Sequence, residues 1–185
     1  MERFFIPVGF QSMQKRKILA ISGSIRKNSS SLAVIDEVAS LLPSNIHLEL
    51  FDALADIPAF DGRDEDPESV KIFKSKIKEA DGVLICTPEY AFGVPGALKN
   101  ALDWTVGSSD FYDKPVALIT ASSQGEKGHE SLQHTLKAIS AKLHPDTTLL
   151  ISFIRAKVKE GKIADEETKI LVTNVVRSFI NLINA

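Results

Sequence analysis

The chain has 185 residues, of which 44% are hydrophobic and 25% charged, and its formal net charge is −2. This length fits one domain, this composition is typical of a globular protein, and the weak net charge gives no reason to expect a nucleic acid as partner. The single cysteine, Cys86, excludes an internal disulfide and a cysteine-based metal cluster. No apolar run is long enough for a membrane helix, so we expect a cytoplasmic protein that binds neither nucleic acid nor a membrane.

The first residues differ in pattern from the rest of the chain. Residues 1–16 contain apolar side chains such as Phe4 and Phe5, but they lack the basic start, the long apolar stretch and the small-residue cleavage site of a secretory signal. We expect this segment to be a disordered or loosely packed extension, and the domain to run from residue 17 to residue 185.

Short apolar runs alternate with helical patterns along the domain, which favours strand-helix units and a parallel sheet. The second run alternates apolar with polar residues, as expected of a less buried strand near a sheet edge. The predicted strands are residues 18–21, 46–50, 82–86 and 116–120, and a fifth strand that begins at Leu149.

Apolar positions three and four residues apart predict the helices between these strands. The predicted helices are residues 32–42, residues 67–80 with Val70, Phe73 and Ile77 on one face, a short helix ending near Trp104, a helix marked by Leu132, Leu136, Ile139 and Leu143, and a last helix over 166–183 with Ile170, Val176, Phe179, Ile180 and Ile183 on its apolar face. Five strands with right-handed crossovers predict a three-layer α/β sandwich, and the strand order common for such sheets is 2-1-3-4-5.

A serine-rich segment, residues 23–31, joins the first strand to the first helix. Ligands of such sheets bind beyond the carboxyl ends of the strands, where the N–H groups and the positive end of a helix favour a phosphate. Arg26 could add a charge-assisted contact. The triphosphate motif GxxxxGK[ST] and the dinucleotide motif GxGxxG are both absent, so a terminal monophosphate suits this loop best. The alternative is a serine-rich turn that only caps the helix.

Two further polar loops follow the third and fourth strands. Two prolines and two glycines hold residues 87–96 in a fixed path, where Tyr90 or Phe92 could stack on a flat ring, and the alternative is a structural loop with core aromatics. Trp104 is expected to pack in the core. In the third loop, residues 121–129, His129 is a candidate proton donor, although a surface histidine at a helix start is the commoner case. Cys86 is expected to be a small core residue and the acidic run 61–66 a solvated loop.

Two of these loops resemble a known family. The segments Gly23–Ser29 (GSIRKNS) and Thr87–Trp104 (TPEYAFGVPGALKNALDW) are similar to the NADPH-dependent FMN reductase family, a flavodoxin-like group that includes bacterial quinone and chromate reductases and azoreductase-type enzymes. The resemblance extends from about Lys17 to the C-terminus. It implies a flavodoxin-like fold, FMN as cofactor and NADPH or NADH as co-substrate.

The resemblance also implies which residues contact the cofactor. The first loop would hold the FMN phosphate, the second would border the ribityl chain and the isoalloxazine ring, and the third would approach the ring from the other side. Carried over to this sequence, the cofactor-binding residues are Ser24, Arg26, Ser29, Ser30, Ser31, Pro88, Glu89, Tyr90, Ala91, Ser122, Ser123 and Gly125.

The chain departs from the family pattern at a few positions. Ala91 stands where the family usually has Asn, so only backbone contact is expected there, and Gly93 often appears as Ser. His129 and Ser131 stand where the family tends to have Gly and Arg. We expect these differences to affect the choice of oxidant and subunit packing more than FMN binding.

The implied function is that of an oxidoreductase. Hydride would pass from the nicotinamide to flavin N5, and the electrons would then pass to a second small-molecule acceptor, which could be a quinone, an azo compound, a metal oxyanion or free flavin. We assign no catalytic side chain and no metal site, and the family implies a homodimer or homotetramer. One alternative is a flavodoxin-type electron carrier, disfavoured by Arg26, Lys27 and the near-neutral charge. A weaker alternative is a flavin-free regulatory or scaffold protein.

Overall fold

The computed structural model describes residues 15–185, and these form one central parallel sheet with strand order β2-β1-β3-β4-β5. The predicted fold class and strand order are confirmed. The predicted extension over residues 1–16 lies almost entirely outside the described residues and stays a prediction. The strands are β1 (Arg16–Ser22), β2 (Ile46–Phe51), β3 (Gly82–Thr87), β4 (Pro115–Ala121) and β5 (Lys142–Ile151).

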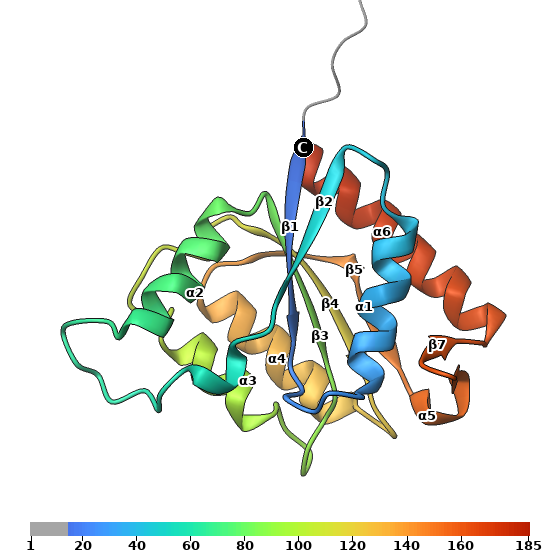
Figure 1. The fold of residues 1–185 in the computed structure, drawn as a ribbon, viewed down its shortest axis with the longest axis horizontal. Helices are drawn as coiled ribbons and strands as arrows, with labels where there is room; N and C mark the ends of the chain where they lie inside the picture. The colour runs from blue at the N-terminus through green and yellow to red at the C-terminus, as the bar shows by residue number, and fades with distance from the viewer. Residues whose placement is uncertain (1–14) are drawn as a thin grey trace, which may run out of the picture.

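Helices cover both faces of this sheet (Figure 1). The helices α1 (Ser30–Leu41) and α6 (Glu166–Asn184) lie on one face, and α2 (Glu68–Glu79), α3 (Gly96–Asp103) and α4 (Glu126–Ala138) lie on the other. The central strand β3 is buried along its whole length, as its continuous apolar sequence predicts for a strand covered on both faces. The predicted apolar face of α2 is also confirmed, because Val70, Phe73 and Ile77 are all fully buried.

Parallel strands place all their carboxyl ends at one edge of the sheet, which is the lower edge in Figure 1. The loops after β1, β3 and β4 therefore come together there. The chain leaves β1 for β2 on one side and later returns to β3 on the other, so this edge contains the crossover point where such sheets bind ligands.

The prediction for the fifth strand is wrong at its start. The strand begins at Lys142, seven residues earlier than Leu149, so Leu143 belongs to β5 and not to α4. The chain turns after α4 at Ser140, whose φ of 61° lies in the left-handed region. The first half of β5 is mostly polar and contains Pro145, so it lacks the apolar run by which the other strands were predicted. A proline is tolerated there because β5 is an edge strand and its pairing with β4 shifts register between Val116 and Leu118.

The apolar face predicted for the last helix is wrong at one position. Ile170 is 61% exposed, whereas Val172 and Val175 are buried against the sheet. The sequence also did not predict four short elements, which are the 3-10 turn η1 (Leu54–Asp56), the single-turn helix α5 (Ile154–Lys157), and the hairpin of β6 (Val158–Lys159) and β7 (Lys162–Ile163). No helix in the part of the chain that the structure describes is long and apolar enough to cross a membrane.

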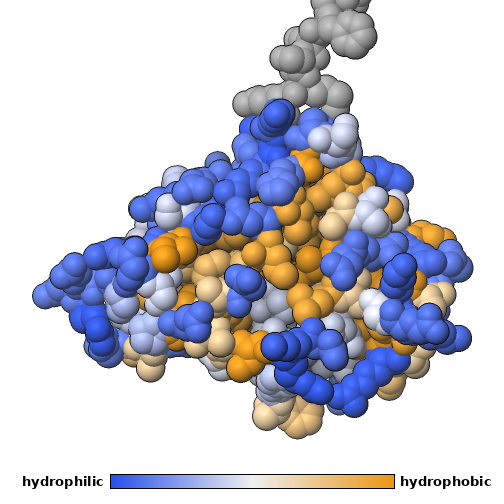
Figure 2. Space-filling model, viewed as in Figure 1, coloured by the Kyte–Doolittle hydropathy of each residue, from blue (hydrophilic) through white to orange (hydrophobic). Residues whose placement is uncertain are grey.

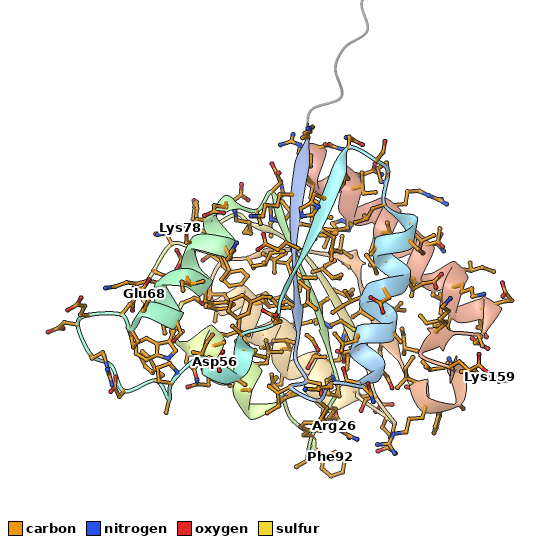
Figure 3. All side chains as sticks on the ribbon, in the orientation of Figure 1. Arg26, Asp56, Glu68, Lys78, Phe92 and Lys159 are labelled. Carbon is orange, nitrogen blue, oxygen red and sulfur yellow. The ribbon has the colours of Figure 1, made fainter. Side chains whose placement is uncertain are left out.

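The acidic segment between η1 and α2 is confirmed as a solvated loop. Residues 61–65 are exposed, and Figure 2 shows hydrophilic surface over this end of the molecule. Arg63 pairs with Asp61 inside the loop, and Lys74 of α2 pairs with Asp66 at 2.7 Å. In Figure 3 this loop extends to the left of the molecule, to the side of the edge where Arg26 and Phe92 lie.

Candidate functional site

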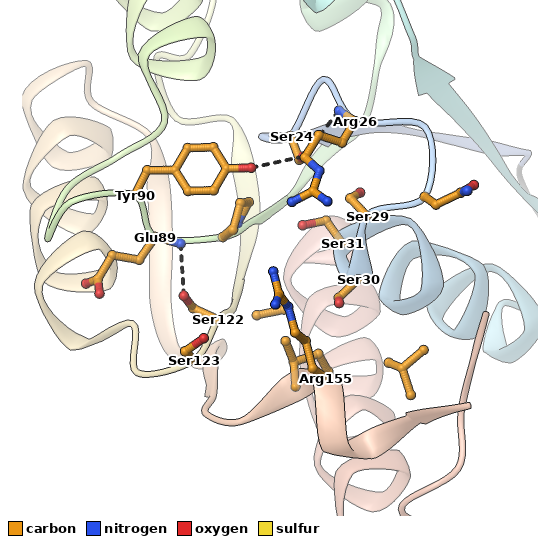
Figure 4. Close-up of a pocket in the computed structure, with 15 residues that line it drawn as sticks. Ser24, Arg26, Ser29, Ser30, Ser31, Glu89, Tyr90, Ser122, Ser123 and Arg155 are labelled. Carbon is orange, nitrogen blue, oxygen red and sulfur yellow. Dashed lines mark hydrogen bonds between the residues drawn. The ribbon is translucent and has the colours of Figure 1, made fainter. Parts of the chain in front are cut away.

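A cavity of about 530 Å³ opens at the lower edge of the sheet, between the ends of β1, β3, β4 and β5. This volume is typical of a site for a ligand of cofactor size. Its lining residues come from four loops and are mostly polar (Figure 4). They are Ser24, Arg26, Asn28, Ser29, Ser30, Ser31, Pro88, Glu89, Tyr90, Ala121, Ser122, Ser123, Ile154, Arg155 and Val158.

The first wall of the cavity is the start of α1. Ser29 has extended backbone angles and is the N-cap, because its hydroxyl accepts a hydrogen bond from the N–H of Leu32 at 3.4 Å. The first N–H groups of a helix have no partner within it, and the helix dipole makes this end positive. The first turn of α1 contains no acidic residue, so no carboxylate of its own neutralises it.

Ser31, in the same turn, presents a buried hydroxyl at the cavity wall. Its side chain is 1% exposed, and its Oγ has no hydrogen-bond partner of standard geometry among residues 15–185. Its polar neighbour is the Cys86 thiol, a weak donor, whose pKa burial raises to about 12 although Ser31 opposes the rise. The thiol therefore stays protonated at neutral pH, and Cys86 is a core residue, as predicted. A hydroxyl whose neighbour is a weakly bonding thiol has capacity for a further hydrogen bond.

Ser24 joins the first loop to the second. Its Oγ accepts the backbone N–H of Arg26 at 3.3 Å and lies 3.4 Å from the hydroxyl of Tyr90. The two loops also lie close together in their backbones, because a Cβ at Gly23 would come within 2.1 Å of Thr87 Oγ1. Glycine is therefore required at position 23 for the first loop to approach the end of β3.

The second loop ends in a tight hairpin at the rim of the cavity. Tyr90 and Gly93 exchange two backbone hydrogen bonds of 3.0 and 2.9 Å, and the two residues between them have positive φ, 48° at Ala91 and 60° at Phe92. Two central residues with positive φ define a type I′ turn. Tyr90 is 46% exposed and Phe92 is 72% exposed, so the rim offers aromatic surface beside the polar cavity.

The side chain of Glu89 points away from the serines and toward the start of α4 (Figure 4). Its carboxylate accepts the backbone N–H of Gly128, in the first turn of α4, at 2.7 Å. Its own N–H donates to Ser122 Oγ at 3.2 Å, which links the second loop to the third. The carboxylate thus compensates the positive end of α4 and not that of α1.

The cavity brings together all the predicted cofactor-binding residues except Ala91 and Gly125. Ala91 lies at the exposed tip of the hairpin. Gly125 is the last residue before α4 and does not line the cavity. Its φ is 108°, and a Cβ at this position would come within 2.6 Å of Leu150. The role of Gly125 in the structure is therefore to form the turn.

Two other side chains discussed from the sequence lie outside the cavity. His129 is half-buried in α4, with Nδ1 2.8 Å from Thr120 Oγ1, and burial lowers the pKa of its imidazole. It is neither a fully exposed histidine nor a lining residue. Trp104 packs as predicted, since it is buried and its Nε1–H donates to the carbonyl of Pro58 at 2.9 Å.

The sequence interpretation missed the fourth wall of the cavity. Ile154, Arg155 and Val158 follow β5, and Asn28 and Ala121 line the cavity beside residues that were predicted. The only available indication for Arg155 was its position after the last strand, on the same edge as the other loops. This position alone did not predict a site residue, because the segment after β5 contains no recognisable loop motif.

The fold and this cavity define a flavodoxin-like protein with a mononucleotide-type site. The sheet has the flavodoxin strand order, and the cavity lies at the crossover edge with hydroxyls, a helix N-terminus and arginine on one side. These donors fit a phosphate, and the neighbouring loops with an aromatic rim fit a flat ring.

Comparison with known proteins identifies the family. Residues 16–154 match the family model for NADPH-dependent FMN reductase. An NADPH azoreductase of Bacillus sp. (strain OY1-2) is 34% identical over 167 residues, covering 87% of this chain and 89% of the relative. A quinone reductase of Escherichia coli (strain K12) is 36% identical over 134 residues, covering 68% and 70%.

A solved structure is similar over nearly the whole fold. The flavoenzyme NAD(P)H:(acceptor) oxidoreductase FerB of Paracoccus denitrificans superposes with a TM-score of 0.74 at 25% identity, covering 91% of this chain and 97% of that one. The chain belongs to the NADPH-dependent FMN reductase family. It is an oxidoreductase with FMN as cofactor and a nicotinamide as co-substrate, which confirms the implied enzyme class and disfavours the electron-carrier alternative.

Proposed function

We propose that the chain binds FMN in the cavity at the crossover edge and reduces a small, flat acceptor of the quinone or azo class with NAD(P)H. The main supporting observation is the cavity, which combines a helix N-terminus and several serine hydroxyls with a rim of loops that are hydrogen-bonded to one another. When bound, FMN supplies the two-electron redox chemistry that no side chain provides.

The first loop is proposed to hold the phosphate. Ser29, Ser30 and Ser31 present hydroxyls and first-turn N–H groups, and Arg26 directs its guanidinium into the same space (Figure 4). The buried Oγ of Ser31 supports this assignment because its contact with the Cys86 thiol is a weak hydrogen bond, and a phosphate oxygen would be a stronger acceptor. Ser24 orients Arg26 through its backbone N–H.

The second and third loops are proposed to border the ring. Pro88 and Tyr90 form one side, Ser122 and Ser123 form the other, and the Glu89 N–H to Ser122 Oγ bond holds the two loops together. Exposed Tyr90 and Phe92 leave apolar surface at the mouth, where an aromatic acceptor can stack and exclude water. The Ala91 backbone and Gly125 belong to these loops and would contribute by shaping them.

The proposal also includes the electron acceptor, the oligomeric state and the cellular location of the enzyme. Relatives are named as azo, quinone and flavin reductases, so these acceptors come before metal oxyanions. A homodimer or homotetramer is proposed from the family, with exposed Phe92 and Phe153 near the cavity as candidate contact surface. A cytoplasmic location is proposed because the nicotinamide reductant is a cytoplasmic metabolite.

The decisive experiment is anaerobic stopped flow on the FMN-loaded protein. Mixing with NADPH or NADH is expected to bleach the flavin absorbance, and adding a benzoquinone or an azo dye is expected to restore it. Comparing rates with chromate and free FMN as acceptors ranks the four classes. A flavin spectrum that neither nicotinamide changes would indicate a carrier, and a protein without FMN affinity would contradict the whole proposal.

A further inference from the structure

Two arginines on different elements face the same cavity. Arg26 lies in the loop after β1, and Arg155 lies in α5, after β5. Figure 4 shows their guanidinium groups directed toward each other across the space bordered by Ser29, Ser30 and Ser31. Because the two positions are far apart in the sequence, only the fold brings these charges together.

The backbone that holds Arg155 is fixed to the third loop. The N–H groups of Phe153 and Ile154 donate to the carbonyls of Ser123 and Ser122, both at 3.1 Å, and Ile154 is buried in the core. Phe153 has a φ of 56°, so a left-handed residue turns the chain at this point. The backbone beside Arg155 is therefore fixed at the cavity wall, and the exposed Arg155 side chain extends from it into the cavity (Figure 4).

Within residues 15–185, Arg26 and Arg155 form no ion pair with a carboxylate, although many other basic side chains there are paired. The one acidic residue of the cavity, Glu89, is bonded to Gly128 and points away. Two cations that face each other repel unless an anion lies between them.

We propose that Arg155 is the second cation of the phosphate site, and that Arg26 and Arg155 together match the two negative charges of a phosphate monoester. This inference rests on the proposed function. It adds that the site prefers FMN to riboflavin, which has no phosphate, largely because of these two arginines. The family match ends at residue 154, so the shared pattern assigns nothing to Arg155. Guanidinium groups suit the task because each can bond two phosphate oxygens.

The test measures the affinity of the purified apoprotein for FMN and for riboflavin by flavin fluorescence. Arg155→Ala is expected to weaken FMN binding about ten- to a hundredfold, the effect of losing one charge-assisted contact, with riboflavin binding unchanged. Arg155→Lys is expected to lose less, because an ammonium keeps the charge but not the bidentate geometry. Arg26→Ala serves as the comparison at the other side of the site.

Lys159→Ala is the matched control, because Lys159 is an exposed cation in the neighbouring β6 that does not line the cavity. It is expected to leave both affinities unchanged. This inference would be overturned if Arg155→Ala left the FMN affinity unchanged, or if both Arg155 variants lost riboflavin and FMN affinity equally. Either result would leave the proposed function intact. A wild-type protein that binds neither flavin would overturn both.

Discussion

At the tip of the hairpin, Ala91 and Phe92 adopt a backbone conformation that is unusual for their residue types. A type I′ turn places both central residues in the left-handed region, where Asn, Asp and Gly are favoured. Here Ala91 and Phe92 occupy these positions with φ of 48° and 60°. The Asn that the family resemblance implies at position 91 would suit this backbone conformation better than Ala. A left-handed conformation costs a non-glycine residue about 1–2 kcal/mol.

Replacing Ala91 is expected to relieve this strain. Ala91→Asn should raise the free energy of unfolding by about 0.5–1 kcal/mol, because Asn tolerates the left-handed region better than Ala. Urea denaturation followed by circular dichroism measures the change. Ala97→Asn, the same substitution inside α3, is the control and should destabilise, since Asn is a poor helix former. An Ala91→Asn protein no more stable than wild type would contradict this account of the turn.

At the scale of elements, one glutamate ties together β1, β2 and α2. Glu49 of β2 pairs with Lys17 of β1 at 2.8 Å and with Lys76 of α2 at 2.6 Å. These lysines lower the pKa of the Glu49 carboxyl from 4.5 to about 2. Since β2 is an edge strand with only one strand neighbour, this network is its main polar link to the helix beside it.

The lowered pKa makes part of the stability depend on pH. The folded state holds Glu49 ionised more strongly than the unfolded state, so its contribution is complete above pH 4.5 and is lost as pH falls toward 2. The group is partly exposed, so the contribution is below about 1 kcal/mol. Glu49→Gln is expected to lower stability at pH 7 and to flatten the pH profile, measured by urea denaturation between pH 7 and pH 2.

Glu160→Gln provides the matched control for this profile. Glu160 is an exposed glutamate in the turn between β6 and β7 and takes part in no ion pair within the described chain. Its substitution should leave the pH profile of the wild-type protein unchanged. An identical profile for Glu49→Gln and wild type would show that the network adds nothing to stability.

At the scale of the whole molecule, the cavity is lined by residues that follow four of the five strands of the sheet, β1, β3, β4 and β5, so a ligand there stabilises the folded domain as a whole. Binding at a hundred times the Kd adds about 2.7 kcal/mol to the free energy of unfolding. For a domain of this length, that raises Tm by roughly 5–11 °C. Thermal melting with excess FMN measures the shift, riboflavin at equal concentration should give a smaller one, and a Tm unmoved by FMN would contradict binding at this site.

The strands and their parallel pairing were predictable because they follow from local patterns, and the strand order and the position of the site then follow from the topology common to such sheets. Continuous apolar runs such as residues 82–86 identify strands buried on both faces, and helical spacing between them implies parallel pairing. The serines before α1 predicted a helix start, and Ser29 is its N-cap. The polar half of β5 escaped prediction because Pro145 and charged neighbours conceal a strand that only an edge position permits.

The sequence by itself determined the doubly wound sheet, the edge at which the loops gather and the phosphate-type donors of the first loop, because hydrophobic period and helix capping act between near neighbours. Only the tertiary structure decided that Glu89 caps α4, that Ser31 has a buried hydroxyl at the cavity wall and that Arg155 faces Arg26. These features join residues distant in the chain, and their proximity depends on strand register and on the turn after β5, which no local pattern specifies.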